Sequence, residues 1–284
     1  MSHENLNNLR VLIWGLGMMG GSLALALKGK CMELMAIDKD PETVNEALAQ
    51  SIVGKADTQP DNLLAVADVI ILAAPVGEII NIVTKLPELH PGNPFLMDIG
   101  STKRRICEVY ERLPDRFDVI GGHPMCGKEK LGLLNAEAEI YQNATFVFTP
   151  LARTSGRARQ LAEQLACAVG AISVWLDPDT HDRWVAGTSH LPYLVAMTLV
   201  LATPLEASAL IGPGFRSVTR LAGTPDTMMW DVLSTNRDHV LNALNTLTDV
   251  MAGVEDLLKK HCDEDLRKQM RFAREQQEIL IERK

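Results

Sequence analysis

Short apolar runs and longer mixed runs alternate along the first 176 residues of the chain. In the segment 68–74, Asp68 is followed by a continuous apolar run, which is typical of a strand that is covered on both faces of a sheet. Other short runs are rich in β-branched and aromatic side chains, and the longer runs between them have the composition of helices. The pattern predicts strands at residues 10–14, 34–37, 68–74, 95–98, 117–120, 145–148 and 172–175.

Alternation of strands and helices predicts the α/β class, with a Rossmann-type, doubly wound and mostly parallel sheet. After Asp177 the spacing of apolar residues is that of helices, without a convincing strand, so we expect an all-helical second domain. The predicted boundaries are 1–177 and 178–284. Residues 191–202 are the most apolar run, but they are fewer than the roughly 20 residues that a spanning helix needs. We predict a buried helix there.

Composition excludes some classes of partner. The chain is 46% hydrophobic and carries a net charge of −8, which argues against nucleic acid or an anionic membrane as a partner. The five cysteines are odd in number and include no C-x-x-C pair. They are typical of reduced thiols, and residues 1–8 have no apolar signal core, so a cytoplasmic location is expected.

The first predicted strand leads directly into G-L-G-M-M-G at positions 15–20 and then into a run of helix formers. This is the dinucleotide-binding arrangement: Gly15 for the turn, Gly17 for close approach to the pyrophosphate, and Gly20 for helix–strand packing. Asp38 ends the second strand, where a carboxylate accepts the ribose hydroxyls and favours NAD over NADP, although Lys39 leaves NADP possible. The predicted cofactor contacts are Gly15, Gly17, Met18, Met19, Gly20, Asp38, Pro75 and Val76.

Polar residues follow two later strands at the edge where α/β sheets bind ligands. Ser101 lies in the segment D-I-G-S-T-K and is either a ligand-binding hydroxyl or a helix N-cap. His123 lies in G-G-H-P, in a predicted loop, where Pro124 keeps its backbone extended. An imidazole there is a natural acceptor for a hydroxyl proton when a hydride leaves the same carbon.

The helical region adds two further groups of candidates. His181 and His190 are nine residues apart and have no cysteine or third histidine at ligand spacing, so no metal site is expected. Arg216 and Arg220 have helical i, i+4 spacing, which suits either an anionic substrate or surface ion pairs.

Five segments occur together in one order: G-L-G-M-M-G-G-S (15–22), D-I-G-S-T-K (98–103), G-H-P-M (122–125), S-H-L-P (189–192) and F-R-S-V-T-R (215–220). In this combination the chain resembles the prephenate and arogenate dehydrogenases, the TyrA family of tyrosine biosynthesis. The resemblance runs from about Leu9 to about Asn242. It implies NAD(P)-dependent oxidative decarboxylation of prephenate to 4-hydroxyphenylpyruvate, and a homodimer built by the helical domain.

The resemblance also implies roles for individual residues. It makes His123 the base that takes the proton of the ring hydroxyl, and Ser101 the support for that histidine and hydroxyl. Arg220 is implied to bind a substrate carboxylate. The remaining implied substrate contacts are His190, Trp230 and, by a looser match, Lys128 and Glu129.

Other functions stay open at this point. Arogenate, which would give tyrosine directly, differs from prephenate by an ammonium in place of a keto group. A β-hydroxyacid or imine reductase has the same two-domain plan, but it usually has a lysine in the first long helix of the helical domain, where this chain has His181 and His190. A non-catalytic NAD-sensing dimer would bind the cofactor without consuming either substrate.

Overall fold

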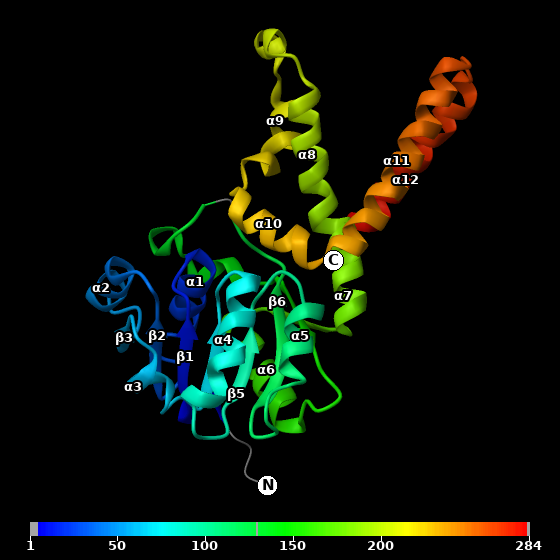
Figure 1. Ribbon diagram of the computed structural model, residues 1–284. Helices are drawn as coiled ribbons and strands as arrows, with labels where there is room; N and C mark the ends of the chain where they lie inside the picture. The colour runs from blue at the N-terminus through cyan, green and yellow to red at the C-terminus, as the bar shows by residue number, and fades with distance from the viewer. Residues whose placement is uncertain (1–4, 129, 283–284) are drawn as a thin grey trace. The chain divides into compact units, whose positions relative to one another are not determined.

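The computed structural model describes residues 5–128 and 130–282. Its centre is one eight-stranded sheet with the strand order β3-β2-β1-β4-β5-β6-β7-β8. The strands are β1 (Arg10–Trp14), β2 (Glu33–Ile37), β3 (Lys55–Asp57), β4 (Val69–Leu72), β5 (Phe95–Asp98), β6 (Asp118–Pro124), β7 (Thr145–Thr149) and β8 (Ile172–Trp175). The first six strands pair in parallel, β7 runs antiparallel to β6, and β8 is parallel to β7. The predicted mostly parallel, doubly wound sheet is therefore confirmed (Figure 1).

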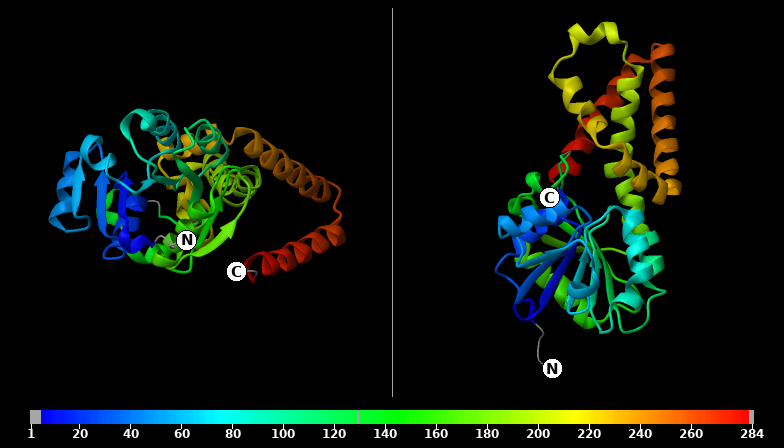
Figure 2. Two further views of the ribbon diagram at one scale, coloured as in Figure 1. Left: turned by 90° about the horizontal axis from the view of Figure 1, so that it is seen from below. Right: turned by 60° about the vertical axis from the view of Figure 1, so that its left-hand side comes forward.

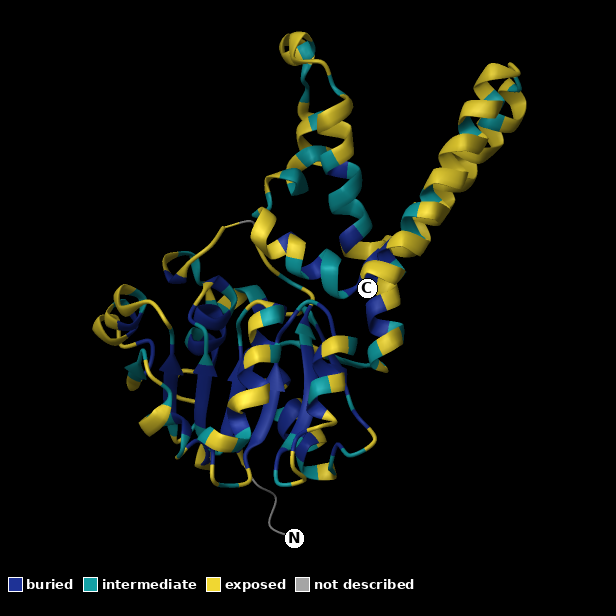
Figure 3. Ribbon diagram, in the orientation of Figure 1, coloured by how far each residue is buried: buried dark blue, intermediate teal, exposed yellow. Residues whose placement is uncertain are grey.

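Alternate residues of the strands feed two cores, one on each face of the sheet. Val11 and Ile13 belong to the core that includes helix α1 (Met18–Leu27) and helix α6 (Gly156–Val169). Leu12, between them, belongs to the core that includes α4 (Val76–Leu89) and α5 (Arg104–Tyr110). Both faces are covered, which explains why the strands read as continuous apolar runs (Figures 1 and 3).

Two details of the sheet differ from the sequence prediction. Strand β3 was not predicted, because it has three residues, two of them charged, and none of them is fully buried at the sheet edge. Strand β6 is longer than expected: its first residues pair with β5, and residues 121–124 then pair with β7. The antiparallel partner extends the strand past Gly121 and Gly122. His123 therefore lies in a strand, and its predicted position in a loop is wrong.

Helices α2 (Pro41–Ala49) and α3 (Asp61–Leu64) complete the nucleotide-binding part, and every described element after β8 is helical. A five-residue π-helical segment, Ala186–His190, joins α7 (Pro178–Val185) to α8 (Leu191–Ala202). The combined helix Pro178–Ala202 is long and apolar enough, by length and composition alone, to cross a bilayer. A core helix of a soluble protein passes the same test, and this helix carries the buried polar residues His181 and Asp182.

The prediction that residues 191–202 form a buried helix is wrong for the single chain. Helix α8 has the predicted bounds, but Ala196 is its one buried residue. Its end exposes Val200 and Leu201, and the following turn exposes Leu205, at 89%. Apolarity alone does not say whether a helix is covered by its own chain or by another molecule.

The remaining helices are α9 (Pro213–Thr219), α10 (Asp226–Thr235), α11 (Arg237–Lys259) and α12 (Asp263–Glu282). Contacts group the chain up to Arg237 into one compact unit and Asp238–Lys284 into another. Figure 2 shows α11 and α12 as long helices, and they are exposed along most of their length (Figure 3). Met251 and Phe272 are among their exposed apolar side chains. The boundary at residues 177 and 178 stays a prediction.

Candidate functional site

The loop between β1 and α1 has the geometry that its three glycines predict. Gly15 has a φ of +106°, and a Cβ atom there would lie 2.4 Å from the carbonyl oxygen of Ala73. A Cβ at Gly20 would lie 1.9 Å from the carbonyl oxygen of Gly15. A Cβ at Gly17, by contrast, would meet nothing within 4 Å. Two glycines are thus required by the fold, while Gly17 keeps open the space in front of the first turn of α1.

Asp38 fixes this loop through its carboxylate. Its Oδ2 accepts the backbone N–H of Leu16 at 2.6 Å, and its Oδ1 accepts that of Asp40 at 3.0 Å. It is half-buried at the end of β2, beside the glycine loop. Pro75 is the N-cap of α4, and Val76, its first residue, is buried. These positions follow β1, β2 and β4, at the carboxyl ends where dinucleotides bind.

The open space at Gly17 suits a pyrophosphate, because the free N–H groups of a helix start favour an anion. We predict that Gly17→Ala leaves the melting temperature nearly unchanged but raises the Kd for NAD⁺ about tenfold or more, since a contact strained by 1–3 kcal/mol costs about that factor. Isothermal titration calorimetry measures the affinity. Gly20→Ala is the contrast, because its Cβ clashes with the backbone and should lower the melting temperature itself. Unchanged NAD⁺ affinity in Gly17→Ala would contradict the placement.

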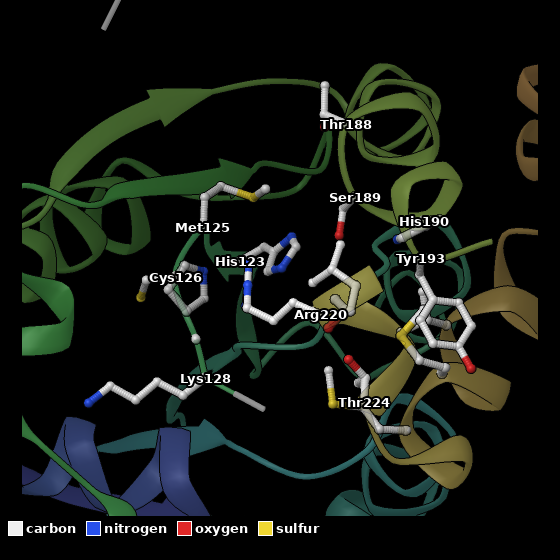
Figure 4. A pocket seen from close by; sticks show the side chains of 17 residues that line it. His123, Met125, Cys126, Lys128, Thr188, Ser189, His190, Tyr193, Arg220 and Thr224 are labelled. Atoms are coloured by element: carbon white, nitrogen blue, oxygen red, sulfur yellow. The ribbon is translucent and has the colours of Figure 1, made fainter. Parts of the chain in front are cut away.

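A cavity of about 370 Å³ lies beside the carboxyl ends of β5 and β6. It is lined by Ser101, residues 123–128, residues 188–190, Tyr193, and side chains from the segment 220–232. Figure 4 shows His123, Ser189 and Arg220 near its centre, with Lys128 and Tyr193 toward opposite sides. The cavity has the size and the mixed lining of a small-molecule site.

His123 is held at this cavity by the backbone of β6. A Cβ at Gly122 would lie 2.6 Å from the carbonyl oxygen of Asp98, and one at Gly121 would lie 2.2 Å from the Thr149 hydroxyl. These glycines therefore let β6 pass close to the neighbouring strands β5 and β7. His123 pairs opposite Val147 and is half-buried.

The ring of His123 contacts a second imidazole. Its Nδ1 lies 2.8 Å from Nε2 of His181, whose Nδ1 lies 2.8 Å from Oδ1 of Asp182. Burial, and then the charges of His181, Lys103 and His190, hold the pKa of His123 well below its ordinary value of 6.5. His123 is therefore neutral at physiological pH and able to accept a proton.

Lys103 of the D-I-G-S-T-K segment lies beneath the site and is fully buried. Its Nζ donates to the carboxylate of Asp98 and, at 2.6 Å, to the carbonyl oxygen of Gly122. These oxygens compensate its charge, and through them Lys103 links the end of β5 to β6. It also places a positive charge close to His123.

His190 is almost fully buried in the π-helical segment, and it lines the cavity. Burial lowers its pKa to about 4, with the carboxylate of Asp182 opposing the shift, so the ring is neutral. The amide of Asn236 lies 3.3 Å from its Nδ1 and can donate to it. In that arrangement the proton of the ring is on Nε2, which makes His190 a neutral hydrogen-bond donor.

The structure separates the two arginines of the predicted i, i+4 pair. Helix α9 ends at Thr219, and Arg220 begins a 3-10 turn. Both arginines are exposed, but Arg220 lines the cavity and Arg216 is not among the described lining residues. Lys128 also lines the cavity and pairs with Glu137.

The other predicted substrate contacts have different placements. Ser101 is half-buried and lines the cavity. Trp230 is 65% exposed, because α10 directs Met229 and Val232 inward, and it is not among the described lining residues. Glu129 lies outside the described residues. These assignments stay predictions.

Sequence reasoning did not assign a role to four of the residues that the fold brings to the site: His181, Asp182, Tyr193 and Asn236. His181 was considered as a metal ligand, a role that was not expected, and Asp182 was given no role. The described residues contain no cluster of three metal-ligating side chains. The available signal was a histidine next to an aspartate, shortly after the helix start at Asp177 and Pro178.

The glycine loop, the acid after β2 and a neutral imidazole at the strand ends define a dinucleotide-dependent dehydrogenase of the Rossmann type. Comparison with known families makes this specific. The family model described as "Prephenate dehydrogenase, nucleotide-binding domain" matches residues 23–174. The model described as "Prephenate dehydrogenase, dimerization domain" matches residues 177–272. The chain belongs to the prephenate dehydrogenase family.

Individual relatives agree with this assignment. The chain is 32% identical to prephenate dehydrogenase of Bacillus subtilis, over 82% of this chain and 65% of that protein. It is also 32% identical to prephenate dehydrogenase of Lactococcus lactis, over 90% of this chain and 70% of the relative. The crystal structure of Aquifex aeolicus prephenate dehydrogenase with hydroxyphenyl propionate and NAD⁺ superposes with a TM-score of 0.90 at 26% identity, covering 98% of this chain and 100% of that one. The match thus spans slightly less than two thirds of the length of the Bacillus protein.

Proposed function

We propose that this protein converts prephenate to 4-hydroxyphenylpyruvate, CO₂ and NADH in tyrosine biosynthesis. The observation that carries the proposal is a neutral, half-buried His123 in a cavity that also contains Arg220, at the carboxyl ends of the strands that follow the glycine loop. Family membership and the ligands of the Aquifex relative support it. Membership of this family also argues against a β-hydroxyacid or imine reductase and against a non-catalytic NAD-sensing dimer.

The chain's own residues have distinct tasks in this reaction. NAD⁺, when bound, supplies the acceptor for the hydride from the hydroxyl-bearing ring carbon. His123 Nε2 takes the hydroxyl proton and returns it to the phenolate oxygen once CO₂ has left, so no net proton is consumed. Arg220 binds a carboxylate, and His190 donates a neutral hydrogen bond. Ser101 bonds the hydroxyl group.

The charge of the cavity favours prephenate over arogenate. Its described lining includes two cations, Lys128 and Arg220, and no aspartate or glutamate. Glu137 pairs with Lys128 but does not itself line the cavity. Prephenate offers two carboxylates and a keto group, whereas the ammonium of arogenate would lie near two cations with no carboxylate among the described lining residues to pair with it.

The nucleotide is NAD, as predicted from Asp38; the family's nucleotide-binding domain and the NAD⁺ bound to the Aquifex relative agree. The carboxylate of Asp38 stands where a 2′-phosphate of NADP would be repelled.

We also propose a homodimer in the cytoplasm. The match to a dimerization domain and the exposed apolar residues of α8, α11 and α12 support the dimer. All five cysteines are free thiols, which suits a reducing compartment. The net charge of −8 argues against nucleic acid and anionic membranes as partners, which stay outside the proposal.

Steady-state assays of the purified protein with prephenate or arogenate, each with NAD⁺ or NADP⁺, test the assignment. We expect kcat/KM to be highest for prephenate with NAD⁺, by about tenfold or more over either exchange, because one unmatched charge or hydrogen bond costs 1–3 kcal/mol. Reduced nucleotide is followed by absorbance and 4-hydroxyphenylpyruvate by chromatography. Turnover of arogenate alone would transfer the assignment to arogenate, and turnover of neither would remove the proposed function.

A further inference from the structure

A short chain of hydrogen bonds leads from His123 into the interior of the protein. His123 Nδ1 is 2.8 Å from His181 Nε2, and His181 Nδ1 is 2.8 Å from Asp182 Oδ1. His181 is 1% exposed and Asp182 is fully buried. Neither lines the cavity, so their effect on a bound molecule is indirect, and His123 is the lining side chain that His181 contacts.

The protons of this chain can be placed by starting from Asp182. Its Oδ1 accepts the N–H of Lys103 at 2.7 Å, and its Oδ2 accepts that of Arg104 at 2.9 Å. Burial on its own raises the pKa of Asp182, but hydrogen bonds from His181 and from these two N–H groups outweigh it and hold the pKa below its ordinary value. Asp182 is therefore a carboxylate that can only accept.

The tautomers of both imidazoles follow. Because Asp182 only accepts, His181 carries its proton on Nδ1. Burial, the largest influence, lowers the pKa of His181, so the ring is neutral and its Nε2 has a free lone pair. That lone pair accepts from His123, whose proton is then on Nδ1. The acceptor left on His123 is Nε2.

We infer that His181 and Asp182 are positioning residues, which hold His123 in the orientation and tautomer that present a bare Nε2 to the substrate hydroxyl. This inference rests on the proposed function. When Nε2 takes the hydroxyl proton, the imidazolium keeps its Nδ1–H bonded to His181, and the carboxylate of Asp182 stabilises the charge through that ring. No proton reaches Asp182, and the proton on Nε2 later returns to the product oxygen.

The fold holds the hydrogen-bonded series His123–His181–Asp182 in place. Asp177 caps α7 by accepting the N–H of Thr180 at 2.9 Å, and Asp182 binds two N–H groups at the start of α5. The Asn236 amide donates to the carbonyl oxygen of Asp182 at 2.7 Å. Helix α7 is thereby attached both to the start of α5, which packs on one face of the nucleotide-binding sheet, and to the end of α10. An imidazole on α7 can then fix another on β6.

Two substitutions separate positioning from packing. His181→Leu keeps much of the volume but removes the acceptor for His123. His181→Gln keeps an amide oxygen that can accept from Nδ1–H of His123. We expect His181→Leu to lower kcat on the order of 10–100-fold, the usual effect of losing an outer partner of a functional imidazole, with the KM for prephenate and the Kd for NAD⁺ unchanged. His181→Gln should recover at least half of that loss on a logarithmic scale.

A buried histidine elsewhere provides the matched control. His90 is 3% exposed, and its Nε2 lies 2.9 Å from the carbonyl oxygen of Ala67, near the opposite ends of the strands. His90→Leu should lower the melting temperature while leaving kcat within about twofold, since surface and core changes far from a site couple weakly to it. In a His123→Asn background, His181→Leu should have no further effect on kcat, because its action passes through His123.

The inference is overturned if His181→Leu turns over prephenate like the wild type, if His181→Gln is as slow as His181→Leu, or if the loss persists in the His123→Asn background. Should His181→Leu fail to fold, the comparison of His181→Gln with wild type in the two backgrounds decides the question. Wild-type protein that leaves prephenate unconsumed contradicts the proposed function instead, so the two failures are distinguishable.

Discussion

His123→Asn should lower kcat for prephenate by about 10²–10⁴-fold, the usual contribution of a general base. Asparagine fills part of the same space and can donate toward His181, but it has no basic nitrogen at the position of Nε2. The Kd for NAD⁺ should be unchanged, because His123 lies in the substrate cavity and outside the glycine loop. Stopped-flow measurement of NADH formation gives the rate, and calorimetry gives the affinity.

The pH profile of the wild type accompanies this test. The base has to be neutral, and the pKa of His123 is lowered well below 6.5. Activity should therefore be fully present at neutral pH and fall only as the solution becomes acid enough to protonate the ring. The acid limb of kcat/KM, which reports the free enzyme, should lie below pH 6.5. A His123→Asn variant with near-normal turnover would falsify the base assignment.

Arg220→Gln should lower kcat/KM by about tenfold to a hundredfold, mainly through KM. A hydrogen bond to a charged group contributes about 1.5–3 kcal/mol, and glutamine retains a donor but loses the charge. If the guanidinium also orients the ring against the nicotinamide, kcat falls as well. Initial rates over a range of prephenate concentrations separate the two effects.

Arg216 provides the control for this substitution. It lies four residues before Arg220, is exposed, and is not among the described lining residues of the cavity. Arg216→Gln removes one positive charge from the same segment. Because that charge is exposed to water and does not line the cavity, the KM for prephenate should stay within about twofold of the wild type. Equal effects of the two substitutions would show that the general positive charge of the segment, rather than a contact of Arg220, attracts the substrate.

The sequence predicts the nucleotide-binding part well because its signals are local. Apolar runs mark strands covered on both faces, and Gly15, Gly17, Gly20 and Asp38 occur at fixed spacing within one βαβ unit. The edge strand β3 lacks such a signal, and its three residues are recognisable only from their pairing with β2.

Features that depend on distant contacts could not be read in this way. The extension of β6 through His123 comes from β7, more than twenty positions along the chain. The contact of His123 with His181 joins residues 58 positions apart, and spacing within one helix gives no indication of it. Helix α8 was expected to be buried because its sequence is apolar. An apolar sequence indicates that a helix packs against something, but not whether that is its own chain or another molecule.

A crystal structure of the protein with NAD⁺ and 4-hydroxyphenylpyruvate tests the central claim most directly. We expect Nε2 of His123 to lie about 2.6–3.2 Å from the phenol oxygen of the product. Nδ1 should remain bonded to His181. A ring whose Nε2 faces away from the phenol oxygen, with another side chain bonded to that oxygen, would contradict the account.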